Sequence, residues 1–266
     1  MLAFGLTLMA GLATGIGSIL AFFASRTNTK FLSFALGFSA GVMIYVSMIE
    51  IFFKAQDALV NELGSPKGNW VTVASFFGGM LLIALIDRLI PEHNNPHELK
   101  KIEEMEKKPV KNVVDDPELM KMGVFSALAL AIHNFPEGIA TFASALQNPT
   151  LGITIAIAIA IHNIPEGIAV SVPVYYATGS KRKAFKISFL SGLSEPLGAL
   201  AAFVVLMPFL NELIFGIIFA GVAGIMVFIS LDELLPAAKK YDEAHTSIYG
   251  LMAGMAVMAV SLLLLM

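Results

Sequence analysis

Two nearly identical ten-residue stretches place histidine, asparagine and glutamate inside long apolar runs. Residues 131–140 read AIHNFPEGIA and residues 160–169 read AIHNIPEGIA, so they differ only at Phe135 and Ile164. A charged side chain in the middle of a membrane costs about 2.5–3.5 kcal/mol on insertion scales. The same polar residues in the same order, twice, therefore indicate a compensating partner, and a divalent metal ion suits them.

The spacing within each stretch brings these side chains together. Histidine and glutamate are four residues apart, so on a helix they lie on one face, one turn apart. The asparagine lies about a quarter-turn round and is still able to face the same cleft. Imidazole, carboxylate and amide oxygen together suit zinc, iron(II), manganese and similar ions. The candidate ligands in the two motifs are His133, Asn134, Glu137, His162, Asn163 and Glu166.

A third carboxylate, Glu195, lies in another apolar run, SGLSEPLG, again beside a proline. It lies about three turns from the basic residues 181–186 and therefore also near mid-depth. Three carboxylates and two imidazoles are able to hold two divalent ions that share bridging carboxylates. Two alternatives stay open: the motifs are hydrogen-bonded pairs that only join two helices, or Glu195 is a protonated structural residue.

The chain as a whole has the composition of a membrane protein. Of its 266 residues, 57% are hydrophobic and only 14% are charged, and the mean hydropathy is +0.79. A soluble domain is far more polar. Apolar runs of about 20 residues, enough to cross a bilayer, recur along it. The sequence predicts a single all-α polytopic domain over residues 1–266, with eight transmembrane helices over 2–24, 31–53, 70–90, 119–146, 150–177, 184–207, 211–236 and 246–266.

The basic residues are sorted between alternate loops. With the amino terminus placed outside, 15 of the 17 lysines and arginines fall on the cytoplasmic side, and only Lys54 and Lys67 fall on the other. This bias follows the positive-inside rule. It predicts a protein of the plasma or inner membrane with both termini outside the cytoplasm.

Residues 91–118 form the one long polar segment and should be a cytoplasmic loop between the third and fourth helices. Its two histidines, His93 and His97, are four residues apart. Prolines lie close by, so the segment need not be helical, and the spacing is weak evidence of a metal site. An ordinary solvated loop is the first interpretation, and a metal-catching or regulatory role is the second.

Other residue types narrow the chemistry. The chain has no cysteine, so disulfides and thiolate ligands are excluded, and a metal site must use nitrogen and oxygen donors. It has no phosphate loop, no nucleotide fingerprint and no basic aromatic surface, which excludes a nucleic-acid partner. Glycine pairs at GxxxG spacing predict close helix packing without chemistry. They are Gly11 with Gly15, Gly37 with Gly41, and Gly250 with Gly254.

The chain contains two inverted repeats. The fourth and fifth predicted helices run in opposite directions, joined by a tight turn at residues 147–149, so the two motifs meet near the midplane, as in inverted-repeat transporters. A fainter repeat relates GVMIYVSMIE, residues 41–50, to GIMVFISLDE, residues 224–233. It places Glu50 near the outer surface and Glu233 near the inner one. Two other interpretations stay open. The repeat is a chance similarity between apolar helices, or the two glutamates are ordinary interfacial charges.

HNFPEG, HNIPEG and SEPLG closely resemble the motifs of the ZIP (Zrt-, Irt-like protein) metal transporters, and in particular their bacterial zinc-uptake type. The resemblance spans all eight predicted helices. It implies a 3+2+3 helix arrangement with zinc moving into the cytoplasm. It further implies two adjacent sites. The zinc site would use His133, Glu137, His162 and Glu166, and the second would use Asn134, Glu137, Asn163, Glu166 and Glu195.

The sequence therefore predicts an importer of divalent metal ions that works in the lipid bilayer, and not an enzyme with a catalytic cofactor. Zn²⁺ is the first expected substrate, followed by Fe²⁺, Mn²⁺, Co²⁺ and Cd²⁺, whose ranking the residues do not decide. A homodimer is one option for the assembly. The alternative function is an intramembrane metal-dependent hydrolase, although no HExxH occurs. A purely structural membrane protein would leave the buried acids unexplained.

Overall fold

The structure is a computed structural model that describes residues 1–21, 29–89, 117–209, 211–240 and 245–265. These residues are almost entirely helical and contain no strand. The polar segment 91–118 lies outside them except for its last two residues, which begin a helix. His93 and His97 also lie outside the described residues, so their predicted role stays a prediction.

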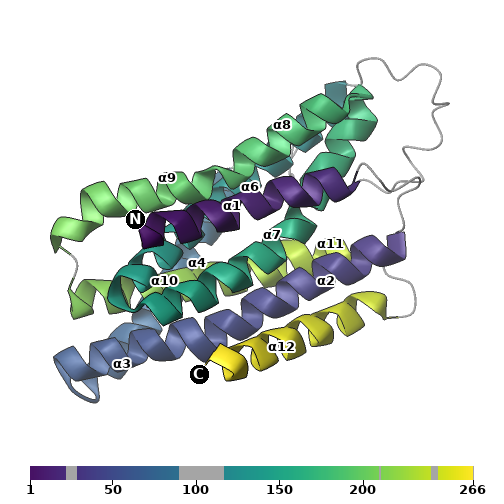
Figure 1. Ribbon diagram of the computed structural model, residues 1–266. Helices are drawn as coiled ribbons and strands as arrows, with labels where there is room; N and C mark the ends of the chain where they lie inside the picture. Colours follow the sequence, from purple (N-terminus) through teal and green to yellow (C-terminus); the bar gives the residue numbers. More distant parts are fainter. Residues whose placement is uncertain (22–28, 90–116, 210, 241–244, 266) are drawn as a thin grey trace.

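The described residues form eight helical segments, one for each predicted helix (Figure 1). Among these residues, seven stretches are long and apolar enough to span a membrane; the remaining segment, α6, is 31 residues long and carries the first motif. The all-α polytopic fold is confirmed. The segments are α1 (Leu2–Ala21); α2 (Thr29–Tyr45), η1 (Val46–Ile51) and α3 (Phe52–Leu63); α4 (Lys67–Leu89); α6 (Pro117–Gln147); α7 (Pro149–Thr178); α8 (Lys181–Gly192), α9 (Ser194–Ala201), η4 (Ala202–Leu206) and η5 (Met207–Phe209); α10 (Glu212–Ile229), η6 (Ser230–Leu234) and α11 (Leu235–Lys240); and α12 (Thr246–Leu265).

The second segment is longer than the sequence predicts. Its apolar run ends near residue 53, but the helix continues as α3 to Leu63, because one face of this polar stretch is still buried. Ala55, Ala58 and Leu59 form that face and pack toward α4 and α10. Gly64, with a φ of 73°, ends the helix by donating its N–H to the carbonyl of Val60.

The turn between the motif helices is as tight as predicted. α6 ends at Gln147 and α7 begins at Pro149. Between them the side chain of Asn148 accepts hydrogen bonds from the N–H groups of Thr150 at 2.9 Å and Leu151 at 3.3 Å. This cap, followed by proline at the first helical position, fixes the start of α7. The two motifs consequently lie on antiparallel neighbouring helices.

Glycine contacts divide the helices into two bundles. In the motif bundle (α1, α6, α7, α8 and α9), Gly17 of α1 lies against the carbonyl of Ile164, and Gly198 of α9 lies against that of Phe135. In the frame bundle (α2, α3, α4, α10 and α12), α2 and α12 interlock through the predicted GxxxG pairs. Among the described glycines, none makes such a contact from one bundle to the other. The interlocking glycines are Gly37, Gly41, Gly250 and Gly254.

The two chain ends lie at the same end of the molecule as the turn between α3 and α4 (Figure 1). α2, α8 and α12 begin at the opposite end. The basic residues at the starts of α2 and α8 are therefore far from Lys54 and Lys67. These lysines and arginines lie at opposite ends of the molecule, as the sequence predicts.

Two adjacent glycines of α4 provide a matched test of the packing. A Cβ on Gly79 would overlap the carbonyl oxygen of Gly221 on α10, whereas a Cβ on Gly78 would meet nothing within 4 Å. We expect Gly79→Ala to lower the free energy of unfolding by about 1–3 kcal/mol, because α4 and α10 must separate. Gly78→Ala should leave it unchanged or raise it by up to about 1 kcal/mol, since alanine is the better helix former. Thermal unfolding in detergent measures both, and equal midpoints would contradict the backbone contact.

Candidate metal centre

All the predicted ligands are buried in the interior of the helix bundle. The seven side chains expose at most 6% of their surface. Six come from the motifs in the middle of α6 and α7, and the seventh comes from the first turn of α9. The buried set is His133, Asn134, Glu137, His162, Asn163, Glu166 and Glu195.

The glycine of each motif brings a neighbouring helix to the site. A Cβ on Gly138 of α6 would overlap the carbonyl oxygen of Glu195, and a Cβ on Gly167 of α7 would overlap that of Thr14. α9 and α1 therefore approach the motif helices backbone to backbone. This close approach places Glu195 of α9 beside the motif of α6.

A break between α8 and α9 sets the position of Glu195. The predicted single helix 184–207 is interrupted at Leu193, three residues before Pro196, whose missing N–H cannot continue the helical hydrogen bonds. Glu195 lies in the first turn of α9, directly after this irregular position.

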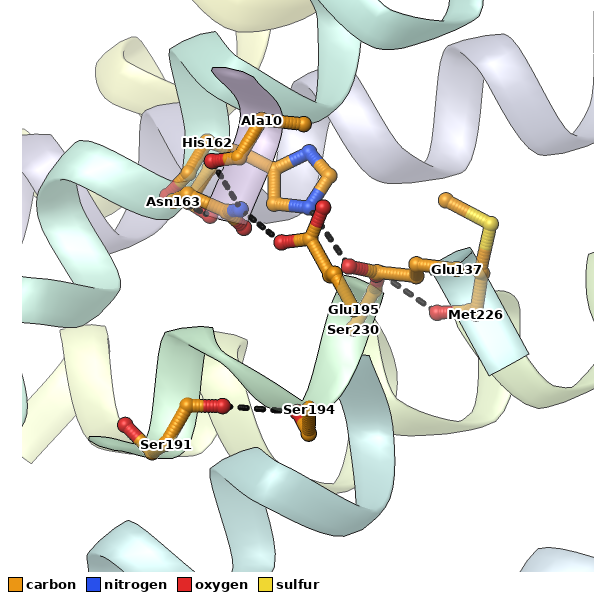
Figure 2. Close-up of polar contacts among 10 residues, drawn as sticks. Ala10, Glu137, His162, Asn163, Ser191, Ser194, Glu195, Met226 and Ser230 are labelled. Carbon is orange, nitrogen blue, oxygen red and sulfur yellow. Dashed lines mark hydrogen bonds and ion pairs between the residues drawn. The ribbon is translucent and has the colours of Figure 1, made fainter. Parts of the chain in front are cut away.

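The two motif helices are joined by a pair of ligands. Nε2 of His162 on α7 lies 3.3 Å from Oε2 of Glu137 on α6, and both side chains are fully buried (Figure 2). The pair links the histidine of one motif to the glutamate of the other. The ligands of the two motifs therefore face one another.

Asn163 connects the motif of α7 to two further helices. Its Nδ2 group donates to Oε1 of Glu195 on α9 and, at 3.0 Å, to the carbonyl oxygen of Ala10 on α1 (Figure 2). The oxygen of the same amide has no hydrogen-bond partner. The two acceptors hold the amide nitrogen, so the oxygen is available to coordinate a cation.

Glu233 was not predicted as part of this cluster. Its Oε1 lies 2.8 Å from Nε2 of His133, and only 13% of its side chain is exposed. The sequence placed Glu233 near the inner surface, because an acidic residue close to the end of an apolar run resembles an interfacial charge. The structure shows a contact that the sequence did not predict: Glu233 lies in the π-helical turn η6, mostly buried, against the histidine of the first motif. The signal available in the sequence was its match to Glu50 in the fainter repeat.

Charge interactions join the remaining acids to the same cluster. Glu166 interacts electrostatically with both histidines and with Glu137 and Glu233, and Glu195 interacts with Glu137 and Glu166. Four carboxylates thus share one poorly hydrated region with two imidazoles. Their mutual repulsion is large where the dielectric constant is low, and a divalent cation would relieve it.

Several polar atoms in the cluster have no hydrogen-bond partner. An unsatisfied buried polar group costs about 1–3 kcal/mol, and most of these atoms are oxygens, which are able to coordinate a cation. They are both polar atoms of the Asn134 amide, Oε1 of Glu137, Nδ1 of His162, Oδ1 of Asn163, Oε2 of Glu166 and Oε2 of Glu195. This donor set fits zinc, iron(II) or manganese.

The ligands are held apart in pairs. Across the part of the chain that the structure describes, no three histidine, aspartate or glutamate side chains already converge as a metal site. His133 is turned to Glu233, His162 to Glu137, and Asn163 to Glu195. Metal binding would therefore exchange these pairings for coordination. Without the ion, these pairings offset part of the charge in the cluster.

Comparison with known proteins finds similarity to zinc transporters. Residues 88–262 match the family model described as ZIP zinc transporter. The chain is 74% identical to the zinc transporter ZupT of Oceanobacillus iheyensis over 265 residues, covering 100% of this chain and 98% of that protein. It is 71% identical to that of Lysinibacillus sphaericus at the same coverage. It is 60% identical to that of Clostridium perfringens over 99% of this chain and 96% of that protein.

Zinc should stabilise the purified protein against heat, because it would bind the folded cluster and not the unfolded chain. At about 100 times the dissociation constant, the expected gain is about 2.7 kcal/mol. Glu137→Gln should lose most of this gain, since it removes a carboxylate from the centre of the cluster. Glu62→Gln, on the exposed face of α3, is the control and should keep it. Equal zinc-induced shifts in both variants would contradict the site.

Proposed function

Because this chain belongs to the ZIP zinc transporter family, we propose that it carries zinc through the membrane into the cytoplasm by way of the buried cluster. The observation that carries the proposal is the set of unpartnered ligand oxygens in a helix bundle whose composition suits lipid. The family match and the names of the relatives support zinc as the transported ion.

Two overlapping sites would share the carboxylates at the centre of the cluster. The contact between His162 and Glu137 supports a site built from both motifs, because it already spans α6 and α7. The contact between Asn163 and Glu195 supports a second, more oxygen-rich site beside it. The first site would use His133, Glu137, His162 and Glu166, and the second would use Asn134, Glu137, Asn163, Glu166 and Glu195.

The donor set supports transport rather than permanent storage of the ion. A transport site must bind strongly enough to strip water from the ion and weakly enough to release it. With no cysteine in the chain, coordination is limited to nitrogen and oxygen donors. Both histidines have a carboxylate partner to return to, Glu233 for His133 and Glu137 for His162, so release would restore two ion pairs.

The oxygen-rich site extends the proposal to other divalent ions. Iron(II) and manganese accept oxygen donors more readily than zinc does, and cobalt and cadmium share zinc's imidazole chemistry. Asn134 and Asn163 provide neutral oxygens for such ions. We therefore include Fe²⁺, Mn²⁺, Co²⁺ and Cd²⁺ as further substrates of the same route.

Uptake into proteoliposomes tests the central site directly. His162→Ala, Glu166→Ala and Glu137→Ala should each abolish saturable zinc uptake, because each removes a ligand of the zinc site while the helices stay packed. Lys67→Ala is the control, since its side chain is exposed and outside the cluster. Circular dichroism and membrane yield confirm that the variants fold. Zinc uptake close to that of the wild type in any of these three variants would contradict the assignment of the zinc site.

The orientation of the chain is tested by labelling single cysteines in a protein that has none of its own. An impermeant maleimide added to intact cells should label Lys67→Cys, at the end where the chain termini lie, and should miss Lys183→Cys at the start of α8. Permeabilised cells should label both. The opposite pattern would invert the proposed topology and with it the direction of transport.

A further inference from the structure

Residues 46–53 and 229–236 repeat one another in structure as well as in sequence. Both contain a π-helical turn, η1 in the first and η6 in the second. From position to position, both also follow the same order of burial: two buried, two exposed, one half-buried, one buried, one half-buried and one exposed. π-turns are rare and are frequent at functional sites. The register makes Ser47 the counterpart of Ser230, and Glu50 the counterpart of Glu233.

The repeat of the motifs obeys the same inverted symmetry. α6 and α7 run antiparallel, and so do the segments that contain η1 and η6 (Figure 1). α10 packs against α6, and α2 packs against α7. Exchanging the two halves therefore converts the observed pair of His133 and Glu233 into a pair of His162 and Glu50. It also converts the pair of His162 and Glu137 into one of His133 and Glu166.

Only one of these two sets of pairs is present in the structure. His133 contacts Glu233, whereas the neighbour of His162 on α2 is Ser39, whose hydroxyl donates to the His162 carbonyl at 3.3 Å. Ser39 precedes Glu50 by 11 residues, which is about 16 Å along a helix. Extended side chains of His162 and Glu50 would span part of that distance.

The serine of the unused half lacks the bond that its counterpart makes. Ser230 donates to the carbonyl of Met226 at 2.7 Å. Ser47 is fully buried, and its hydroxyl has no partner. The half that contains Ser47 and Glu50 is therefore the half whose buried serine hydroxyl is left unsatisfied.

The boundary between the two bundles permits the exchange. No described glycine locks α7 to α2 or α6 to α10. Because α2 and α10 run in opposite directions, a single shift of the motif helices would carry His162 toward Glu50 and His133 away from Glu233. One movement thus breaks one pair and makes the other.

We propose that Glu50 and Ser47 form a second cation station, which binds a divalent transition-metal ion together with His162 in the alternate state. This inference rests on the proposed function and deepens it. The helix that contains Glu50 continues as α3 to the end of the molecule where the chain termini lie, so Glu50 receives the ion from that side (Figure 1). The charge that interacts with Glu50 here is Lys54, one turn farther on, and a doubly charged ion displaces it.

Cross-linking tests the exchange without relying on transport. Glu50→Cys with His162→Cys, and separately Glu233→Cys with His133→Cys, would be oxidised in membranes with copper phenanthroline, and linked peptides identified by mass spectrometry. The account expects both disulfides. Met48→Cys with His162→Cys is the matched control, because Met48 is exposed two residues from Glu50 and should not link. The proposal is overturned if residues 50 and 162 link no more than the control, or if residues 133 and 233 do not link.

Zinc uptake against external concentration supplies the second readout. Glu50→Gln should raise the half-saturating zinc concentration roughly threefold to tenfold, since one charged contact to the entering ion is lost. Glu50→Asp should restore it, and Glu233→Gln should mainly lower the maximal rate. Curves for Glu50→Gln that match the wild type would show that the repeat records only common origin. Cross-links without any zinc uptake by the wild type would instead refute the proposed function and leave the exchange standing.

Discussion

Compensation of buried charge is the constraint on which the rest of this structure depends. Glu137, Glu166, Glu195 and Glu233 share a region with two imidazoles in the interior of a bundle suited to lipid. Each acid alone would be costly there. The observed pairs, and the proposed metal ions, are two ways to meet the same electrostatic demand. A site that exchanges one for the other is able to load and unload without ever exposing an isolated charge to lipid.

The helix packing follows from what this cluster requires. Gly138 and Gly167 let α9 and α1 approach the motif helices closely enough for Asn163 to reach both Glu195 and the Ala10 carbonyl. The glycines of the frame bundle hold α2 to α12 in the same manner. Between the bundles, the described glycines make no such contact, and the polar contacts include the pair of His133 and Glu233 and the bond from Ser39 to the His162 carbonyl. The boundary between the two bundles therefore passes through the site.

The helices and the buried ligands were predictable from the sequence, because apolar runs and duplicated polar motifs are local signals. The extension through α3 was missed because Lys54 interrupts the apolar run while one helix face stays buried. The contact of Glu233 with His133 was missed because it depends on packing against α6. The cytoplasmic side of the membrane stays a prediction, because it does not follow from contacts within the chain, and the 3+2+3 arrangement stays a prediction as well.

X-ray absorption at the zinc edge of the loaded, purified protein tests the central claim most directly, because it identifies the atoms around the ion. The account predicts a first shell of nitrogen and oxygen at about 2.0–2.2 Å with imidazole scattering, and no sulfur. The imidazole scattering should disappear, with weaker zinc retention, when His133 and His162 are both replaced by alanine. An unchanged spectrum in that double variant would show that zinc binds elsewhere and would contradict the account.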